Sequence, residues 1–242
     1  MITNLGEMTY DAGQFKLDRR YSKGLTLSSS LTWAHAQQNS LLPWDQHSFT
    51  WGNIPTYDIR LKWVGIASYD LPWGSNLHGV AHGFLAGWQT NFVAFWSTGL
   101  DYSIINASPQ TNVGATTDGT NGGRTADSPN LVGDPNSGPN IHTVQRWFNT
   151  AAFALQPQYT AGNLGPGTMH GPPQRRLDIA LSKSLHVTER QTVQIRVESY
   201  NITNTPSFQP PDGNFGSSTF GSISSTGNAP PRQMQFGVKY LF

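Results

Sequence analysis

Residues 25–34 read LTLSSSLTWA, and this stretch decides the fold. Leu25, Leu27, Leu31 and Trp33 alternate with small, mostly polar side chains, with Ser29 the one polar member of the apolar series. Because successive side chains of a β-strand point to opposite faces, the pattern predicts a strand with one oily and one watery side. About ten residues suffice for a tilted strand to cross a bilayer. We therefore predict a transmembrane β-strand here.

The same alternation recurs along the chain in six more segments. These predicted strands are residues 13–21, 57–71, 88–100, 176–185, 192–202 and 233–242. Residues 22–24, Ser-Lys-Gly, predict a tight turn between the first two strands, in which glycine supplies the positive φ. Prolines and a glycine interrupt residues 35–56, which we predict to be a loop, and residues 76–87 are predicted to be irregular or a short helical turn.

The lengths of the connections orient the sheet. Long connections follow the second, fourth and sixth strands, and shorter ones follow the first, third and fifth. Outer-membrane barrels have long extracellular loops and short periplasmic turns. The predicted fold is all-β: an antiparallel up-and-down transmembrane β-barrel segment with a periplasmic C-terminus, in which residues 101–174 form a long extracellular loop.

Ordinary closed bacterial barrels have an even number of strands, at least eight, so seven strands cannot form one. An open sheet in lipid leaves unpaired backbone groups, each costing several kcal/mol. Residues 1–242 are therefore expected to be one C-terminal segment of a larger barrel, without the strands that should pair with the first one. The N-terminal residues also show no basic start and apolar run of a secretory signal.

The composition excludes several classes of protein. Charged residues make up only 12% and aromatic residues 12%, the reverse of a disordered chain. The net charge of +1 gives no broad field for nucleic acid, so no nucleic-acid partner is expected. The absence of cysteine excludes disulfides, thiolate metal sites and a cysteine nucleophile. No apolar run approaches the length of a transmembrane helix.

Several stretches resemble a known family, the Oar-like TonB-dependent receptors. They are FKLDRRYSKGL (15–25), WFNTAAF (147–153), GNLG (162–165) continuing to Gly171-Pro172, and ESYNITNTPSF (198–208). The chain also ends on a phenylalanine preceded by apolar residues at alternate positions, which resembles the signal read by the barrel assembly machinery. The residues of that signal are Phe236, Val238, Tyr240 and Phe242.

The resemblance implies a role in transport. Such receptors have about twenty-two strands around a plugged lumen and take up large nutrients with energy delivered by TonB. No plug, TonB box or N-terminal accessory domain is recognisable in this sequence, so the chain alone is not expected to transport. The implied partners are outer-membrane lipid, the barrel assembly machinery, the missing barrel strands and, only through the missing N-terminal parts, TonB.

Two groups of residues are candidate functional residues of the barrel. Five tryptophans are expected to form an aromatic girdle at the membrane interfaces, with sugar stacking as the alternative: Trp33, Trp63, Trp73, Trp88 and Trp96. The charged residues Asp178, Arg196 and Glu198, with Lys183 nearby, could indicate acid–base catalysis. We interpret the first three instead as lumen-facing charges that pair across neighbouring strands.

Three other patterns contain residues that can bind metal ions or phosphate, but their spacing does not support such a site. His78 and His82 lie four apart but lack the glutamate of a zinc-protease helix, so we expect a turn rather than a metal site. Asp118, Asp127 and Asp134 match no EF-hand, so a solvated loop is preferred to a Ca²⁺ site. The glycine-rich residues 119–123 lack the partners of a phosphate loop. No enzyme activity and no cofactor are expected.

A second interpretation belongs to a different class of protein. A secreted all-β module that binds carbohydrate or another ligand on an aromatic face would also be rich in alternating strands. The two interpretations differ in behaviour, because a sandwich should be soluble and monomeric without detergent. A barrel segment should aggregate through its open edges and apolar band.

Overall fold

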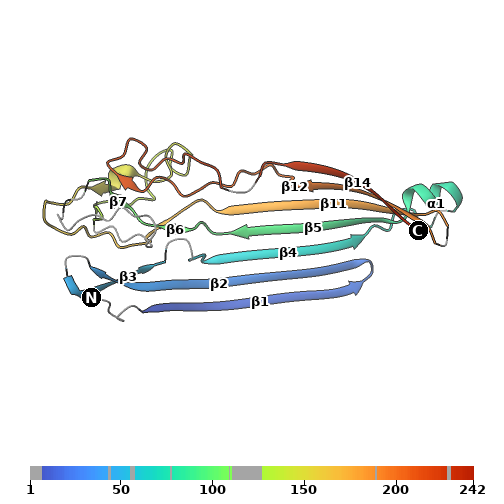
Figure 1. The fold of residues 1–242 in the computed structure, drawn as a ribbon, viewed down its shortest axis with the longest axis horizontal. Coiled ribbons are helices and arrows are strands. Elements are labelled where there is room, and N and C mark those ends of the chain that lie inside the picture. The colour runs from blue at the N-terminus through green and yellow to red at the C-terminus, as the bar shows by residue number, and fades with distance from the viewer. Residues whose placement is uncertain are drawn as a thin grey trace.

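The computed structural model describes residues 7–42, 45–54, 58–76, 78–108, 110, 127–188, 190–227 and 230–242. A single antiparallel sheet dominates it, and its long strands follow one another in chain order (Figure 1). They are β1 (Met8–Ser22), β2 (Leu25–Leu42), β4 (Leu61–Asp70), β5 (Trp88–Ser97), β11 (Gln174–His186), β12 (Thr192–Tyr200) and β14 (Gln233–Leu241). The seven strands predicted from alternation and their up-and-down order are confirmed.

The loop predicted over residues 35–56 is wrong in most of its length. β2 continues to Leu42, and β3 (Asp45–Asn53) folds back against its outer end, with Gln37 opposite Asn53. This hairpin lies beyond the apolar part of the sheet, where neither face has to be oily. The sequence of residues 35–53 therefore has no sustained alternation of apolar and polar residues, although the backbone ladder forms in the usual way.

The strand register places most of the apolar residues of the seven strands on one face, which we call the apolar face. Phe15 lies opposite Leu31, Leu31 opposite Trp63, and Trp63 opposite Trp96. The series passes on through β11 and β12 to β14 without changing face. On β11 and β14 its members are Leu177, Ile179, Leu181, Phe236, Val238 and Tyr240.

The opposite face, here the polar face, carries mainly Ser, Thr, Gln, Asn and charged residues. Ser28, Ser30 and Thr32 of β2 lie on it, opposite polar residues of β1. An apolar patch interrupts this face between β4 and β5, where Val64 lies opposite Phe95. The separation into two faces otherwise follows the alternation in the sequence.

The two ends of the sheet differ in how the strands are connected (Figure 1). At one end β1 and β2 are joined by Lys23 and Gly24, both with positive φ (52° and 81°), as a two-residue hairpin turn requires. At the same end α1 (Gly79–Leu85) lies between β4 and β5, so the predicted irregular segment does include a helical turn. Among the described residues, no helix is long and apolar enough to cross a membrane.

At the other end the two longest connections fold together into a loop domain, formed by the described residues of 98–173 and 201–232 (Figure 1). Its short elements are β6 (Asp101–Tyr102), β7 (Ile105–Asn106), β8 (Asn130–Leu131), η1 (Thr150–Ala152), β9 (Phe153–Ala154), β10 (Met169–His170) and β13 (Asn214–Phe215). Phe148 is 1% exposed and contacts Phe153 and Phe220 edge to face, with ring centroids 5.4 and 5.1 Å apart. The predicted irregular loop therefore contains a packed core.

The sheet is not closed into a barrel. Among the described residues β1 pairs only with β2, and β14 pairs only with β12. Since neighbouring strands alternate in direction across seven positions, the two edge strands run the same way. Both edges therefore expose backbone groups that could accept a further strand.

Candidate functional site

The apolar face is the largest candidate site, because no protein covers it in the part of the chain that the structure describes. Phe236 and Val238 of β14 are 74% and 75% exposed, and Phe15 and Leu17 of β1 are similarly open. Side chains of this kind are normally buried in a soluble protein. An exposed apolar surface that spans seven strands marks contact with a partner or a membrane.

Four of the five predicted girdle tryptophans lie on the apolar face, in two groups. Trp63 and Trp96 lie directly opposite each other near the loop domain, and Trp33 lies on the neighbouring strand at the same end. Trp88 begins β5 at the other end and donates from its ring nitrogen to the Phe84 carbonyl, 3.1 Å away. Eight positions separate Trp88 from Trp96, about 26 Å along the strand at 3.3 Å per residue.

Trp73 is the exception among the five. It lies in the turn after β4 and is exposed, at the same end of the sheet as Trp88. The structure therefore brings the predicted aromatic residues together as one group at each end of the apolar face, with Trp73 just outside the strands.

The predicted charges lie together on the polar face, but they do not pair across the sheet. Asp178 contacts Arg176 at 2.8 Å, and Arg196 contacts Glu198 at 2.6 Å, so each ion pair runs along a single strand. The cross-strand neighbours explain this correction, because they are uncharged: Val93 beside Asp178, Ser182 and Gly237 beside Arg196, and Ala180 and Gln235 beside Glu198. Each of these charges therefore pairs within its own strand on the polar face.

The predicted assembly signal lies on the edge strand β14. Phe236, Val238 and Tyr240 project from the apolar face, and the Tyr240 ring stacks on Phe242 with centroids 5.7 Å apart. Phe242 is the most exposed of them. The four residues therefore form one accessible apolar row.

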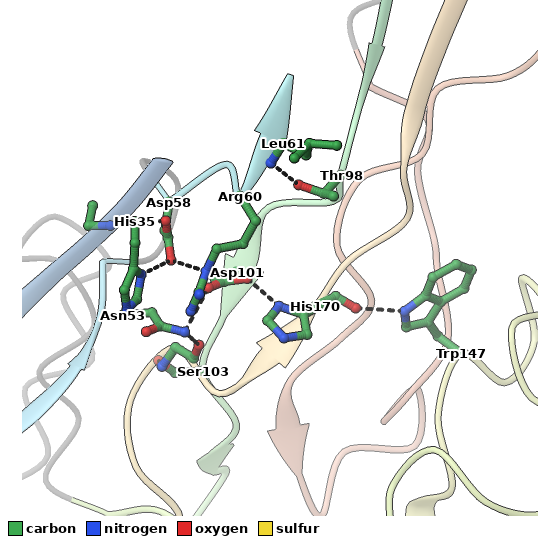
Figure 2. Close-up of polar contacts among 12 residues, drawn as sticks. His35, Asn53, Asp58, Arg60, Leu61, Thr98, Asp101, Ser103, Trp147 and His170 are labelled. Carbon is green, nitrogen blue, oxygen red and sulfur yellow. Dashed lines mark hydrogen bonds and ion pairs between the residues drawn. The ribbon is translucent and has the colours of Figure 1, made fainter. Parts of the chain in front are cut away.

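Sequence reasoning missed a polar cluster with two buried carboxylates where the loop domain meets the sheet, here called the junction cluster (Figure 2). It consists of His35, Asn53, Asp58, Arg60, Asp101 and His170. The side chain of Asp58 is fully buried and contacts His35 Nδ1 at 3.1 Å and Arg60 Nε at 2.9 Å. It also accepts from the Ala36 backbone N–H at 3.0 Å, which ties the segment before β4 to β2.

Asp101 is the second buried carboxylate of the junction cluster. It contacts His170 Nδ1 and accepts from Asn53 Nδ2 at 2.8 Å, and Asn53 also donates to the Gly167 carbonyl at 2.9 Å. The hydrogen bond to Asp101 raises the pKa of His170, although partial burial of the imidazole opposes this. Trp147 donates from its ring nitrogen to the His170 carbonyl at 2.9 Å.

Glycine permits the close approach of backbones at this junction. Gly167 has φ +64°, and a Cβ there would lie 2.3 Å from the Asn53 carbonyl oxygen. A Cβ on Gly52 would similarly lie 2.3 Å from Pro166. The stretch that begins GNLG at residue 162 therefore packs directly on the outer hairpin, where a larger residue would not fit.

The junction cluster has the properties of a structural network. Both carboxylates are held by side-chain donors, and among the described residues no group of three His, Cys, Asp or Glu could hold a metal ion. The six residues are spread from position 35 to position 170 without regular spacing, so no sequence motif could have identified them. The hydrogen bonds of the junction cluster join the loop domain to the outer hairpin, through Asn53, Asp101 and Gly167.

The other metal candidates have local explanations in the structure. His82 lies in α1 with Nδ1 3.0 Å from the Gly74 carbonyl, and His78 precedes the helix. Asp134 accepts from the Asn136 N–H at 2.8 Å in a turn. Asp127 is buried, so the prediction that it lies in a solvated loop is wrong, while Asp118 and residues 119–123 lie outside the described residues.

Comparison with known proteins adds one finding. A protein-family model described as an outer membrane beta barrel domain matches residues 1–235. No curated protein and no solved structure matches the chain.

Proposed function

Because the chain belongs to the outer membrane beta barrel domain family, we propose that it forms part of the barrel wall of a TonB-dependent receptor that resembles the Oar-like proteins. One observation carries the proposal: the apolar side chains of seven consecutive strands share one face that no described part of the chain covers. Lipid hydrocarbon is the partner that such a surface requires. The receptor assignment itself is supported by the four resembling stretches of sequence.

The proposal assigns a side of the membrane to each end of the sheet. The loop domain lies outside the cell, and the end with the Lys23–Gly24 turn and the C-terminus lies in the periplasm, since long loops are extracellular in these barrels. The tryptophans at the two ends of the apolar face are the interfacial girdle. Their separation of about 26 Å along a tilted strand is comparable with the apolar band of about 25 Å in such proteins.

The open edges of the sheet require further strands. β1 and β14 run in the same direction, so an antiparallel barrel can close only if an odd number of strands lies between them. We assign these strands to the remainder of the receptor. Any coupling to TonB would then act through parts of the receptor other than this sheet.

The remaining partners follow from the same proposal. The exposed row on β14 from Phe236 to Phe242 is the signal for the barrel assembly machinery. Asp178, Arg196 and Glu198 face the lumen, and together with the loop domain they would line the path of a large nutrient. The role proposed is transport rather than catalysis.

Cysteine labelling in intact cells tests the membrane arrangement. The chain has no cysteine, so Tyr159→Cys on the exposed loop-domain surface and Val187→Cys in the β11–β12 turn each give a single label. A membrane-impermeant maleimide should label Y159C in intact cells and V187C only after the outer membrane is permeabilised. Equal labelling of both, or recovery of a soluble monomer, would contradict the proposal and favour a secreted binding module.

Growth on a large nutrient tests the receptor assignment separately. A strain that lacks the protein and a strain that lacks TonB should lose uptake of the same nutrient. Uptake that continues without TonB would contradict this assignment while leaving the barrel intact.

A further inference from the structure

A tryptophan and a cation lie opposite each other at both ends of the apolar stretch of β5 and β11. Trp88 is paired with Lys183, and Trp96 with Arg175. Between these pairs the apolar face carries no charge on either strand. The residues between them are Thr90, Phe92, Ala94, Leu177, Ile179 and Leu181.

In the pair near α1, the cation of Lys183 finds its partners within the protein. Lys183 is only 4% exposed, and its Nζ donates to the Ala86 carbonyl just after α1. The same ammonium lies over the Trp88 ring, 5.3 Å from its centroid. The charge is thus shielded by a carbonyl and by an aromatic face.

The pair near the loop domain lacks such a partner. Arg175 is exposed, and within the described residues it makes no ion pair. The apolar face of β4, β5 and β11 carries no Asp or Glu that could reach it. Its neighbours on that face are Trp96 and, one strand further, Trp63, which is also accessible.

We infer that Arg175 binds the phosphate of a lipid headgroup in the leaflet on the loop-domain side, with Trp96 and Trp63 at the same depth. This inference rests on the proposed membrane contact of the apolar face. A guanidinium offers forked donors that match a phosphate, and tryptophan prefers the interfacial layer. The phosphate supplies the acceptor that Ala86 supplies to Lys183.

Native mass spectrometry of the protein isolated from outer membranes tests this. Phosphatidylglycerol and phosphatidylcholine are added in separate arms, because only the first has a net negative headgroup. The wild-type protein should retain phosphatidylglycerol preferentially. Arg175→Gln should weaken that retention about fivefold, since one basic residue at an anionic surface contributes about 1 kcal/mol. Arg175→Lys should restore part of it.

Lys62→Gln is the matched control, because it removes one exposed cation at the same depth from the polar face. It should keep the wild-type preference, and an equal loss in K62Q and R175Q would overturn the inference by showing an effect of net charge. Displacement of the lipid by inorganic phosphate would also overturn it. Protein that inserts normally but shows no headgroup preference refutes this site alone, whereas failure to insert counts against the proposed function.

Discussion

The sheet and the loop domain use the same kinds of side chain in opposite ways. In the loop domain Phe148 is almost completely buried among other aromatic rings, whereas on the sheet Phe236 is 74% exposed. The loop domain is held together by its own core. The sheet is held together by its backbone ladder and by contact of its apolar face with lipid. An apolar side chain therefore stabilises one region through protein contacts and the other through lipid.

The largest expected effect is the loss of the loop-domain core. Phe148→Ala should destabilise that domain by about 3–5 kcal/mol, as for large-to-small changes in packed cores. Hydrogen exchange of the Trp147 amide, which donates to the Gly221 carbonyl at 2.7 Å, reports it. Phe236→Ala makes the same chemical change on the apolar face and should leave this exchange unaltered. Equal acceleration in both variants would show that the two regions are not independent.

A charge in the middle of the apolar face should have the next largest effect. Ile179 lies midway between the two tryptophan–cation pairs, and Ile179→Arg should destabilise the inserted sheet by about 2–4 kcal/mol. Denaturant unfolding in lipid vesicles measures this. Ala180→Arg places the same group on the polar face beside Glu198 and should cost little. If both variants behaved alike, the apolar face would not be the one in contact with lipid.

The contact between the two regions should be sensitive to a single methyl group. Gly167→Ala combines a positive φ with a Cβ 2.3 Å from the Asn53 carbonyl, so we expect a loss of about 1–3 kcal/mol in loop-domain docking. The thermal transition of the isolated receptor should fall accordingly. Gly83→Ala in α1 is the control, since a Cβ there meets nothing within 4 Å. An unchanged transition in the Gly167 variant would mean that the junction is not rigid.

The smallest effect is a dependence of docking on pH. Because Asp101 raises the pKa of His170 above its ordinary 6.5, the folded state favours the protonated imidazole. This contribution is complete below about pH 6.5 and is lost as the pH rises through the raised pKa. The His170 side chain is 61% exposed, so solvent screening keeps this contribution to the free energy of docking below about 1 kcal/mol. Hydrogen exchange of the Gly171 amide, followed against pH after correction for intrinsic rates, should show it, and His170→Gln should abolish it.

The sheet could be predicted from the sequence because its signal is local. Alternation between adjacent residues, as in residues 25–34, determines which face each side chain occupies, and the register keeps the predicted apolar series of neighbouring strands on one face up to the irregularity after Arg19 of β1. The outer hairpin was missed for the same reason: beyond the lipid no alternation is required of His35 to Leu42.

The loop domain and the junction cluster could not be predicted in this way. The contact between Phe148 and Phe220 spans 72 positions, and that between Asp101 and His170 spans 69. No periodic pattern encodes such pairs. The WFNTAAF stretch was noticed as a family resemblance, and the structure supplies its physical role, because Phe148, Ala152 and Phe153 belong to the core.

The length of β2 has a mechanical consequence. Its 18 residues extend for about 60 Å, more than twice the height of an apolar band, and pair with β1 from Leu25 to Gln38 with one irregularity near the turn. Ala36 in its outer half holds Asp58 and so helps to carry the loop domain. A bend in the middle of β2 would have to break hydrogen bonds between β2 and β1. We therefore expect the loop domain to stay fixed relative to the sheet rather than to move as a lid.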